Sequence, residues 1–580
     1  MDRNVPGPSS SKKPKLSKKT PLKKYLTHDE LEKLLYESDD DFDESYLVKD
    51  VDEESSGEED VSQTENLGDD EDRACEESID DMDTVEEGES SQSPQVICDE
   101  PAWSDTPDLL DIPFTKTNEF LWPFPGSKPI DIFNFLVDDT FYQKIVEETN
   151  AYAEDVLLEQ GFLEYSRISR WKPVTIEELK IFFSLILHTG TIHLPRLKDY
   201  WKTDRLFNIP SFRDSMGRDR FFLILRCLHF SKNPTKNEPK PEDRLFKIRP
   251  LIHYFNNKIN DTYYPTQNLS IDESMMLYRG RLSFRQYIPN KRHKYGIKFY
   301  MLTEPDGLIL KFLIYTGNLA DAGGKGHAAN VVLHLLEGKL DQGHCVFMDN
   351  YYNSFTLSRQ LLERKTHTTG TLRIDRKYSP KSVKEAKLKK GETVAKYANN
   401  VMIGKWRDKR DVTYISTEFK NNLQTFFNKR GKEVSKPLPV LKYNNYMGGV
   451  DRQDQFMSYY PCRHKSLRWY KKVAIHVYQL LLLNSFFLYK KYVSPRATLY
   501  DFRLQIIAAL LPEKPKETVN FPTHLLTQCP KDGKGKILRK RCASCSQRGV
   551  RKDTSLMCRI CKVGLCLEPC FELYHQNMQN

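Results

Sequence analysis

The cysteines near the C-terminus constrain the fold of this chain more than any other feature. Six of the 12 cysteines fall between Cys542 and Cys570, as two C-x2-C pairs followed by two single positions. Paired C-x2-C knuckles supply thiolates to a tetrahedral zinc ion, and flanking histidines can complete such a site. Eight ligands would satisfy two closed structural sites, so the pattern predicts two Zn²⁺ ions as cofactors. The candidate ligands are His524, Cys542, Cys545, Cys558, Cys561, Cys566, Cys570 and His575.

The spacing leaves two alternatives open in this region. Cys529 competes with His524 for the eighth position, and the sequence does not say which ligands share an ion. The order also lacks the internal histidine of a typical RING domain, which disfavours ubiquitin ligation. The first residues contain no apolar secretion segment, so cysteines at this density indicate metal in a reducing compartment rather than disulfides.

The net charge of +8 conceals a strong segregation along the 580 residues. From Glu37 to Glu100 the chain carries 28 acidic residues against two basic ones, which leaves 86 basic and 52 acidic residues elsewhere. A folded body this basic predicts a polyanionic partner, with nucleic acid favoured over a solvated surface that binds nothing. The basic run from Lys12 to Lys24 and a second run, KGKILRKRC, predict nuclear localisation or phosphate contacts. The second run supplies Lys536, Arg539, Lys540 and Arg541.

The periodicity of apolar residues divides the chain into several predicted domains. Helical spacing from residue 114 to 265 is followed by alternating strand patterns, and long helices resume after residue 459. The apolar run from Ala474 to Tyr492 is interrupted by polar residues, so it predicts a buried helix and no membrane partner. The predicted divisions are a disordered tail at 1–113, helical parts at 114–265 and 459–520, a mixed α/β core at 266–375 and 440–458, a lysine-rich insertion at 376–439, and the zinc-binding domain at 521–580.

Four aspartates in the mixed core are candidates for chemistry. Asp272 is predicted at the end of a strand, Asp349 directly follows the apolar run CVFM, and Asp451 and Asp454 share one face of a helix after two glycines. Carboxylates are hard ligands for Mg²⁺ or Mn²⁺, and two such ions support displacement at a phosphodiester. Each aspartate taken alone is more often a cap or a surface carboxylate. A P-loop is excluded because DAGGKGH lacks the required spacing, and no G-x-S-x-G elbow is present.

Three segments resemble the signature blocks of piggyBac-type transposases and piggyBac transposable element-derived proteins: NLSIDESMMLYRGR, VFMDNYYNS and YNNYMGGVDRQDQF. The resemblance implies an RNase H-like core whose catalytic triad is Asp272, Asp349 and Asp451, with Asp454 as a further acid and two Mg²⁺ or Mn²⁺ ions. It also implies a split helical dimerisation and DNA-binding domain, a homodimer, and a cysteine-rich domain that binds terminal repeats. The implied activity is cut-and-paste movement at TTAA targets through hairpin intermediates, and Trp469 matches a tryptophan near the DNA.

A basic and aromatic run follows Asp272 and is predicted to hold the DNA near the carboxylates. Its aromatic residues Tyr278, Phe284, Tyr287 and Tyr295 are expected to pack in a hairpin or to stack on unpaired bases. Its basic residues are expected to neutralise flanking phosphates. They are Arg279, Arg281, Arg285, Lys291, Arg292, Lys294 and Lys298.

Two other functions remain open from the sequence. A domesticated relative that keeps DNA binding without excision would carry the same blocks. A zinc-dependent protein-interaction module attached to an acidic tail would explain the termini but leaves the aspartates unexplained.

Overall fold

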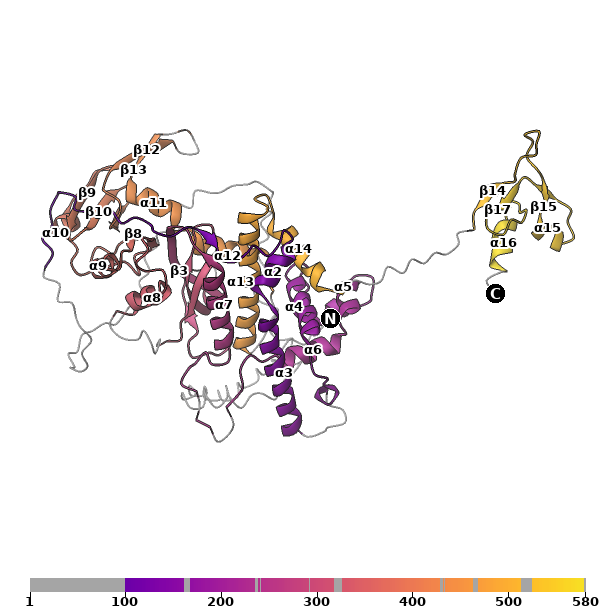
Figure 1. Ribbon diagram of the computed structural model, residues 1–580, viewed down its shortest axis with the longest axis horizontal. Coiled ribbons are helices and arrows are strands. Elements are labelled where there is room, and N and C mark those ends of the chain that lie inside the picture. Colours follow the sequence, from indigo (N-terminus) through magenta and orange to yellow (C-terminus); the bar gives the residue numbers. More distant parts are fainter. Residues whose placement is uncertain are drawn as a thin grey trace, which may run out of the picture. The chain divides into compact units, whose positions relative to one another are not determined.

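A computed structural model describes most of the chain after residue 99 as two compact units, which divide between Ile507 and Ala508 (Figure 1). The predicted basic run of the tail, the acidic run as far as Asp99, and Arg292 lie outside the described residues. The described ranges are 100–160, 167–234, 238–239, 241–289, 291, 293–317, 326–427, 431, 433–462, 468–512 and 524–577.

A nine-stranded mixed sheet forms the centre of the first unit. Three of its strands are antiparallel neighbours in the order β6-β5-β3, and β7 and β8 continue the sheet parallel to β3. Parallel neighbours require crossover connections, which α8 (His327–Leu335) and α9 (Phe355–Glu363) supply. The strands are β3 (Asn268–Leu277), β4 (Gln286–Tyr287), β5 (Tyr295–Thr303), β6 (Ile309–Ile314), β7 (Cys345–Met348) and β8 (His367–Thr371).

The lysine-rich segment predicted as an insertion extends this sheet rather than forming a sheet of its own. Its strands β11 (Asp411–Ser416), β10 (Val401–Arg407) and β9 (Thr393–Ala398) follow β8 in antiparallel order. The short helix α10 (Lys381–Glu385) precedes them, and a separate hairpin of β12 (Leu423–Phe427) and β13 (Glu433–Pro437) follows. The chain then enters α11 (Leu438–Tyr446) and α12 (Gly449–Tyr459).

Helix α13 (Trp469–Tyr492) is the central helix of the helical part and lies against α2 (Pro129–Leu136) and α7 (Arg249–Thr262) (Figure 1). A helix that is apolar all round needs cover on every side. By length and composition it is the one candidate for a membrane span among the described residues, but 83% of its apolar window is buried within the protein, as in a core helix.

The remaining helices of this part agree with the helical periodicity of the sequence. The helical spacing predicted between residues 114 and 265 is present, for example, in α4 and α6. The elements are β1 (Glu119–Phe120), α3 (Asp139–Gln160), η2 (Arg167–Arg170), α4 (Ile176–Thr189), η3 (Leu197–Trp201), α5 (Pro210–Ser215), α6 (Arg218–Cys227), β2 (Tyr263–Tyr264) and α14 (Leu499–Leu510).

Ordered structure begins before Phe114, where the sequence predicts disorder. Ser104 exchanges two backbone hydrogen bonds of 2.9 Å with Tyr397 on β9, and Asp105 pairs with Lys396 at 2.7 Å. Because β9 is an edge strand, its free backbone groups can accept such a partner. This short polar segment carries no periodic signal, so its pairing with a distant strand was not predictable from sequence.

The C-terminal unit has very little regular structure. Two strand pairs, β14 (Leu526–Gln528) with β17 (Leu556–Cys558) and β15 (Lys540–Arg541) with β16 (Asp553–Thr554), flank the helices α15 (Ala543–Gln547) and α16 (Cys570–Gln576). Its buried cluster consists of Leu565 and five cysteines, so the predicted metal ligands themselves make most of the core.

Candidate active site and zinc centres

The register of two parallel strands brings Asp272 and Asp349 to neighbouring positions. β3 and β7 pair from Asn268 with Cys345 to Ile271 with Met348, so each aspartate is the residue that follows the last pair. Asp349 comes directly after the end of β7, as predicted. Asp272 was predicted at a strand end, but β3 continues to Leu277 because β5 pairs with its other edge.

Helix α12 brings Asp451 and Asp454 to the same face of β3. A Cβ on Gly449 would lie 2.2 Å from Thr303 Oγ1, so glycine is needed for the close approach of the helix to the sheet. The Ser274 hydroxyl donates a 2.5 Å hydrogen bond to Asp454 Oδ1. Asp451 lies in the first turn of the helix with its side chain exposed. The predicted helix with two aspartates on one face is therefore present.

The carboxylates are close enough to change one another's pKa. Burial raises the pKa of Asp272 well above its usual value, and the neighbouring charges of Glu273, Asp349 and Asp451 raise it further. Burial, with a contribution from Glu273, raises the pKa of Asp349 to about 6. Burial also raises the pKa of Asp454 to about 7, although the Ser274 hydrogen bond opposes the shift. A divalent cation would offset this concentration of negative charge.

Lys291 was predicted to contact DNA, but its ammonium belongs to the carboxylate cluster. Its Nζ donates to the carbonyl oxygen of Glu273 at 3.2 Å. Burial alone would lower the pKa of Lys291, yet the attraction of Asp272, Glu273 and Asp451 raises it overall. Sequence proximity to the other basic residues gave no sign that this lysine turns inward.

The aspartates are less tightly gathered than the predicted zinc ligands. Among the described residues, the groups of three or more metal-ligating side chains whose ligand atoms all lie within 4.8 Å of one another are both in the C-terminal unit. Mutual repulsion of ionised carboxylates favours such a separation. The donor set of hard oxygens nevertheless fits Mg²⁺ or Mn²⁺.

Lys298 also departs from its predicted role. Its Nζ lies 3.4 Å from Glu273 Oε1, and only 12% of its side chain is exposed. The rings of Tyr300 and Tyr351 lie 4.6 and 4.8 Å from the ammonium. The alternation of β5 turns Lys298 to the face of the sheet that carries Glu273, so in this structure its ammonium pairs with that carboxylate.

The other basic residues of this run that the structure describes remain candidates for phosphate contacts. Arg279, Arg281, Arg285 and Lys294 are exposed, and the Arg285 guanidinium lies 5.3 Å from the ring of Tyr295. Sequence alone does not separate these four from Lys291 and Lys298.

The aromatic residues divide between the core and the surface. Tyr278 and Phe284 are buried, whereas Tyr287 and Tyr295 are exposed with their ring centroids 4.6 Å apart. Trp469 is only 9% exposed and packs edge-on against Phe284 at 5.2 Å. Its indole is therefore part of the core rather than an open stacking surface.

The first cysteine cluster brings together two pairs of cysteines that are separated along the sequence. Cys542, Cys545, Cys566 and Cys570 have their sulfur atoms within 4.8 Å of one another. The Cys545 and Cys570 sulfurs are 3.4 Å apart, near the spacing of about 3.8 Å that two thiolates take on a tetrahedral zinc ion. All four residues are buried, as in a closed structural site.

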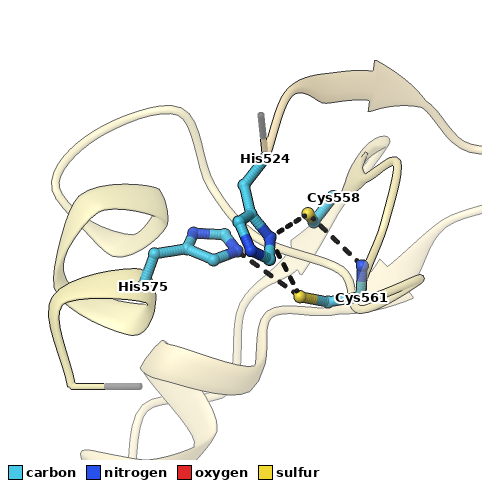
Figure 2. Close-up of side chains that lie close together, drawn as sticks. All are labelled: His524, Cys558, Cys561 and His575. Atoms are coloured by element: carbon cyan, nitrogen blue, oxygen red, sulfur yellow. Dashed lines mark hydrogen bonds between the residues drawn. The ribbon is translucent and has the colours of Figure 1, made fainter. Parts of the chain in front are cut away.

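The second cluster combines His524, Cys558, Cys561 and His575 (Figure 2). His524 Nδ1 lies 3.4 Å from the Cys558 sulfur and 3.2 Å from the Cys561 sulfur, while His575 Nε2 lies 3.6 Å from the latter. His575 Nδ1 is 2.8 Å from the Phe571 carbonyl oxygen, an arrangement that leaves Nε2 for a metal. Both clusters thus fit zinc.

The two clusters answer the questions that the spacing left open. Their ligands alternate along the chain. His524 precedes the first cluster, Cys558 and Cys561 lie between its two pairs of cysteines, and His575 follows it. His524, and not Cys529, completes the second group, while Cys529 is a buried free cysteine. In the nearby basic run, Lys536, Arg539 and Arg541 are exposed, whereas the Lys540 ammonium donates to the Lys562 carbonyl oxygen.

Comparison with known families defines the class of this protein. Residues 128–486 match the family model described as "Transposase IS4", and residues 522–576 match a "DDE_Tnp_1-like zinc finger". The first match covers more than half of the chain, so the class is that of the transposases. The second covers the C-terminal unit with both Cys/His clusters.

The relatives narrow this class further. Human PiggyBac transposable element-derived protein 3 is 27% identical over 478 residues, covering 77% of this chain and 76% of that protein. Human PiggyBac transposable element-derived protein 2 is 26% identical over 383 residues, covering 62% and 61%. The chain belongs to the piggyBac-type transposase family, which confirms the resemblance drawn from the three sequence blocks.

A solved structure shares the fold. The cryo-EM structure of a piggyBac transposase synaptic complex with hairpin DNA aligns with a TM-score of 0.59 at 22% identity, covering 77% of this chain and 98% of that one. The predicted mixed α/β architecture is therefore confirmed, and the zinc-finger match over residues 522–576 supports the predicted zinc-binding end.

Proposed function

We propose that this protein is a cut-and-paste DNA transposase whose active site is formed by Asp272, Asp349 and Asp451. The observation that carries the proposal is the register of β3 and β7, which sets two of these aspartates side by side while α12 adds the third. The strand order β6-β5-β3-β7-β8, with three antiparallel and then two parallel strands, supports an RNase H-like core. Membership of a transposase family supports the reaction class.

The three aspartates would hold two divalent ions, Mg²⁺ or Mn²⁺. When bound, such ions activate an attacking oxygen and stabilise the leaving one at a phosphodiester. Asp454 holds α12 against β3 through Ser274, which places Asp451. The exposed Arg279, Arg281, Arg285 and Lys294 would neutralise phosphates beside the scissile bond.

The DNA partners proposed for this chain are transposon ends and a TTAA target. Binding of terminal repeats is assigned to the C-terminal unit with its two zinc ions and exposed Lys536, Arg539 and Arg541. The structural neighbour is a synaptic complex with hairpin DNA, and this supports a homodimer that holds two ends and a hairpin intermediate. Nuclear localisation follows from a DNA substrate and stays a proposal.

An excision assay tests this function. Zinc-loaded protein is incubated with a donor DNA that carries the element's own ends, with Mg²⁺ present or withheld. We expect excision only with Mg²⁺, and complete loss in the Asp349→Asn variant while DNA binding is retained, since asparagine removes a charged ligand and not packing. Excision by Asp349→Asn at the wild-type rate would refute the site.

Two observations favour a second candidate, a domesticated DNA-binding protein without excision activity. The human relatives are named as transposable element-derived proteins. The inward-facing Lys291 also supplies positive charge where metal ions are proposed. If the wild type and Asp349→Asn bind transposon-end DNA equally well and neither cuts it with Mg²⁺ or Mn²⁺, this second function holds.

A further inference from the structure

We propose that Glu273 and Tyr352 form a positioning pair that fixes Asp349 relative to Asp272, and so sets the affinity of the site for divalent ions. This inference rests on the proposed function. Neither residue was among the candidates from sequence, because glutamate beside an aspartate and a tyrosine in an aromatic run carry no distinctive pattern.

Glu273 acts on both sides of the site at once. Its backbone N–H donates to Asp272 Oδ1 at 2.8 Å, which orients that carboxylate. Its side chain points to the opposite face of the sheet, where the Tyr352 hydroxyl donates to Glu273 Oε1 at 2.8 Å. Glu273 is 9% exposed and Tyr352 is 2% exposed, so water does not compete for this bond.

Tyr352 belongs to the turn that carries Asp349. The Tyr351 N–H donates to Asp349 Oδ1 at 2.9 Å, and the side-chain amide of Asn353 donates to the carbonyl oxygens of Met348 and Thr371 at 2.8 and 3.0 Å. The turn is therefore held to the end of β7 and to β8. The Tyr352 bond adds a connection to β3 beyond the last backbone pair of Ile271 and Met348.

The Lys298 ammonium supports the acceptor of this bond. Its Nζ lies 3.4 Å from Glu273 Oε1, the same oxygen that accepts the Tyr352 hydrogen bond. A charged acceptor makes a stronger hydrogen bond than a neutral one. The pair is thus a stiff link between the two strands that carry metal-ligating carboxylates.

Metal binding depends on such outer contacts, because they orient the ligating carboxylates and so set the geometry that an ion meets. Without the Tyr352 hydroxyl, the turn after β7 would keep its own hydrogen bonds but lose its tie to β3. The expected consequence is a wider range of Asp272 to Asp349 separations and weaker binding of two closely spaced ions.

The test uses Mn²⁺ as the probe, counted by electron paramagnetic resonance on the zinc-loaded full chain without DNA. Asp349→Asn defines the Mn²⁺ that binds elsewhere. We expect Tyr352→Phe to weaken the Asp349-dependent binding about tenfold, with a melting temperature lowered no more than in the control variant. Tyr414→Phe is the matched control, because that tyrosine is equally buried in the same sheet but its hydroxyl bonds Thr393 and Asn421, away from the aspartates.

Glutamate variants give an independent measurement if Tyr352→Phe does not fold. Glu273→Gln keeps an acceptor oxygen and should lose less Mn²⁺ affinity than Glu273→Ala. Wild-type affinity in both Tyr352→Phe and Glu273→Ala would overturn the positioning pair alone. Equal Mn²⁺ binding by the wild type and Asp349→Asn would instead overturn the proposed metal site.

Discussion

The two proposed sets of metal ligands in this chain are assembled in opposite ways. In the C-terminal unit the ligand atoms of each group lie within 4.8 Å of one another, and five of the cysteines make up most of the buried core. The aspartates of the first unit come from β3, from the end of β7 and from α12, and they rest on a sheet with its own apolar core. The comparison predicts that the C-terminal unit needs zinc ions to fold, whereas the first unit folds first and then offers its aspartates to ions.

The largest expected effect is the loss of a zinc ligand. Cys558→Ser should release at least one zinc ion per chain and unfold the C-terminal unit, since zinc binding contributes on the order of 10 kcal/mol to such small folds. The first unit should keep its own melting transition. Metal analysis and limited proteolysis measure the two outcomes.

Cys529→Ser is the matched control, because Cys529 is also buried but lies outside both clusters. It should retain both zinc ions. A Cys558→Ser protein that keeps its zinc and its protease resistance would remove the contrast between the two units.

The loss of Asp349 should have the opposite effect on stability, because it should stabilise its unit rather than unfold it. The raised pKa of Asp349, about 6, means that this residue favours folding only at acidic pH, and that this contribution is lost as the pH rises from about 4 through 6. At pH 8 and without Mg²⁺, Asp349→Asn should therefore stabilise the first unit by up to about 3 kcal/mol. Urea unfolding of the zinc-loaded protein measures this change, and a clear destabilisation would contradict the assignment of Asp349 to a strained ligand position.

One histidine of the first unit should have the opposite pH dependence to Asp349, for a reason unrelated to metals. His476 lies in α13 beside Phe299, and burial, with the charge of Lys472, lowers its pKa to about 4. In the unfolded chain His476 binds a proton near pH 6.5, whereas in the folded protein it stays neutral down to about pH 4. Its contribution to the free energy of unfolding is therefore present above pH 6.5 and is lost as the pH falls to about 4. Between pH 7 and pH 5 this amounts to about 2 kcal/mol.

His476→Leu, which replaces the ring with an apolar side chain of similar size, should flatten that part of the pH dependence. Urea unfolding at both pH values gives the slope. An unchanged slope would assign the acid sensitivity of the first unit to other groups.

More of the zinc-binding region than of the aspartate site could be predicted from the sequence. The reason is that the zinc ligands are close together in the sequence, whereas the aspartates meet only in the folded chain. The zinc ligands lie close together in sequence with a recurrent spacing, so their identity was predictable, while their division between ions required the three-dimensional fold. For the aspartates, the alternation of CVFMD and the two glycines before Asp451 predicted a strand end and a helix start. The inward turn of Lys291 and the role of Glu273 were not predictable. Both depend on which distant side chains the folded chain places on each face of β3.

The same comparison predicts a smaller difference between the two zinc centres. Four thiolates leave a zinc ion with a net charge of about −2, whereas two thiolates and two neutral histidines leave it neutral. The Arg548 guanidinium lies 3.0 Å from the Cys570 sulfur and 3.9 Å from the Cys545 sulfur, where it offsets that charge. Arg548→Ala should therefore weaken the four-cysteine centre by about 1 kcal/mol, or roughly fivefold in zinc affinity.

Competition with a coloured chelator resolves this effect, because the release of the two ions can be followed as separate phases. Arg548→Ala should accelerate one phase and leave the other at the wild-type rate. Arg551→Ala, at an exposed position nearby, should change neither phase. Equal acceleration of both phases would mean that Arg548 supports the unit as a whole, and the charge difference between the centres would then have no part in their stability.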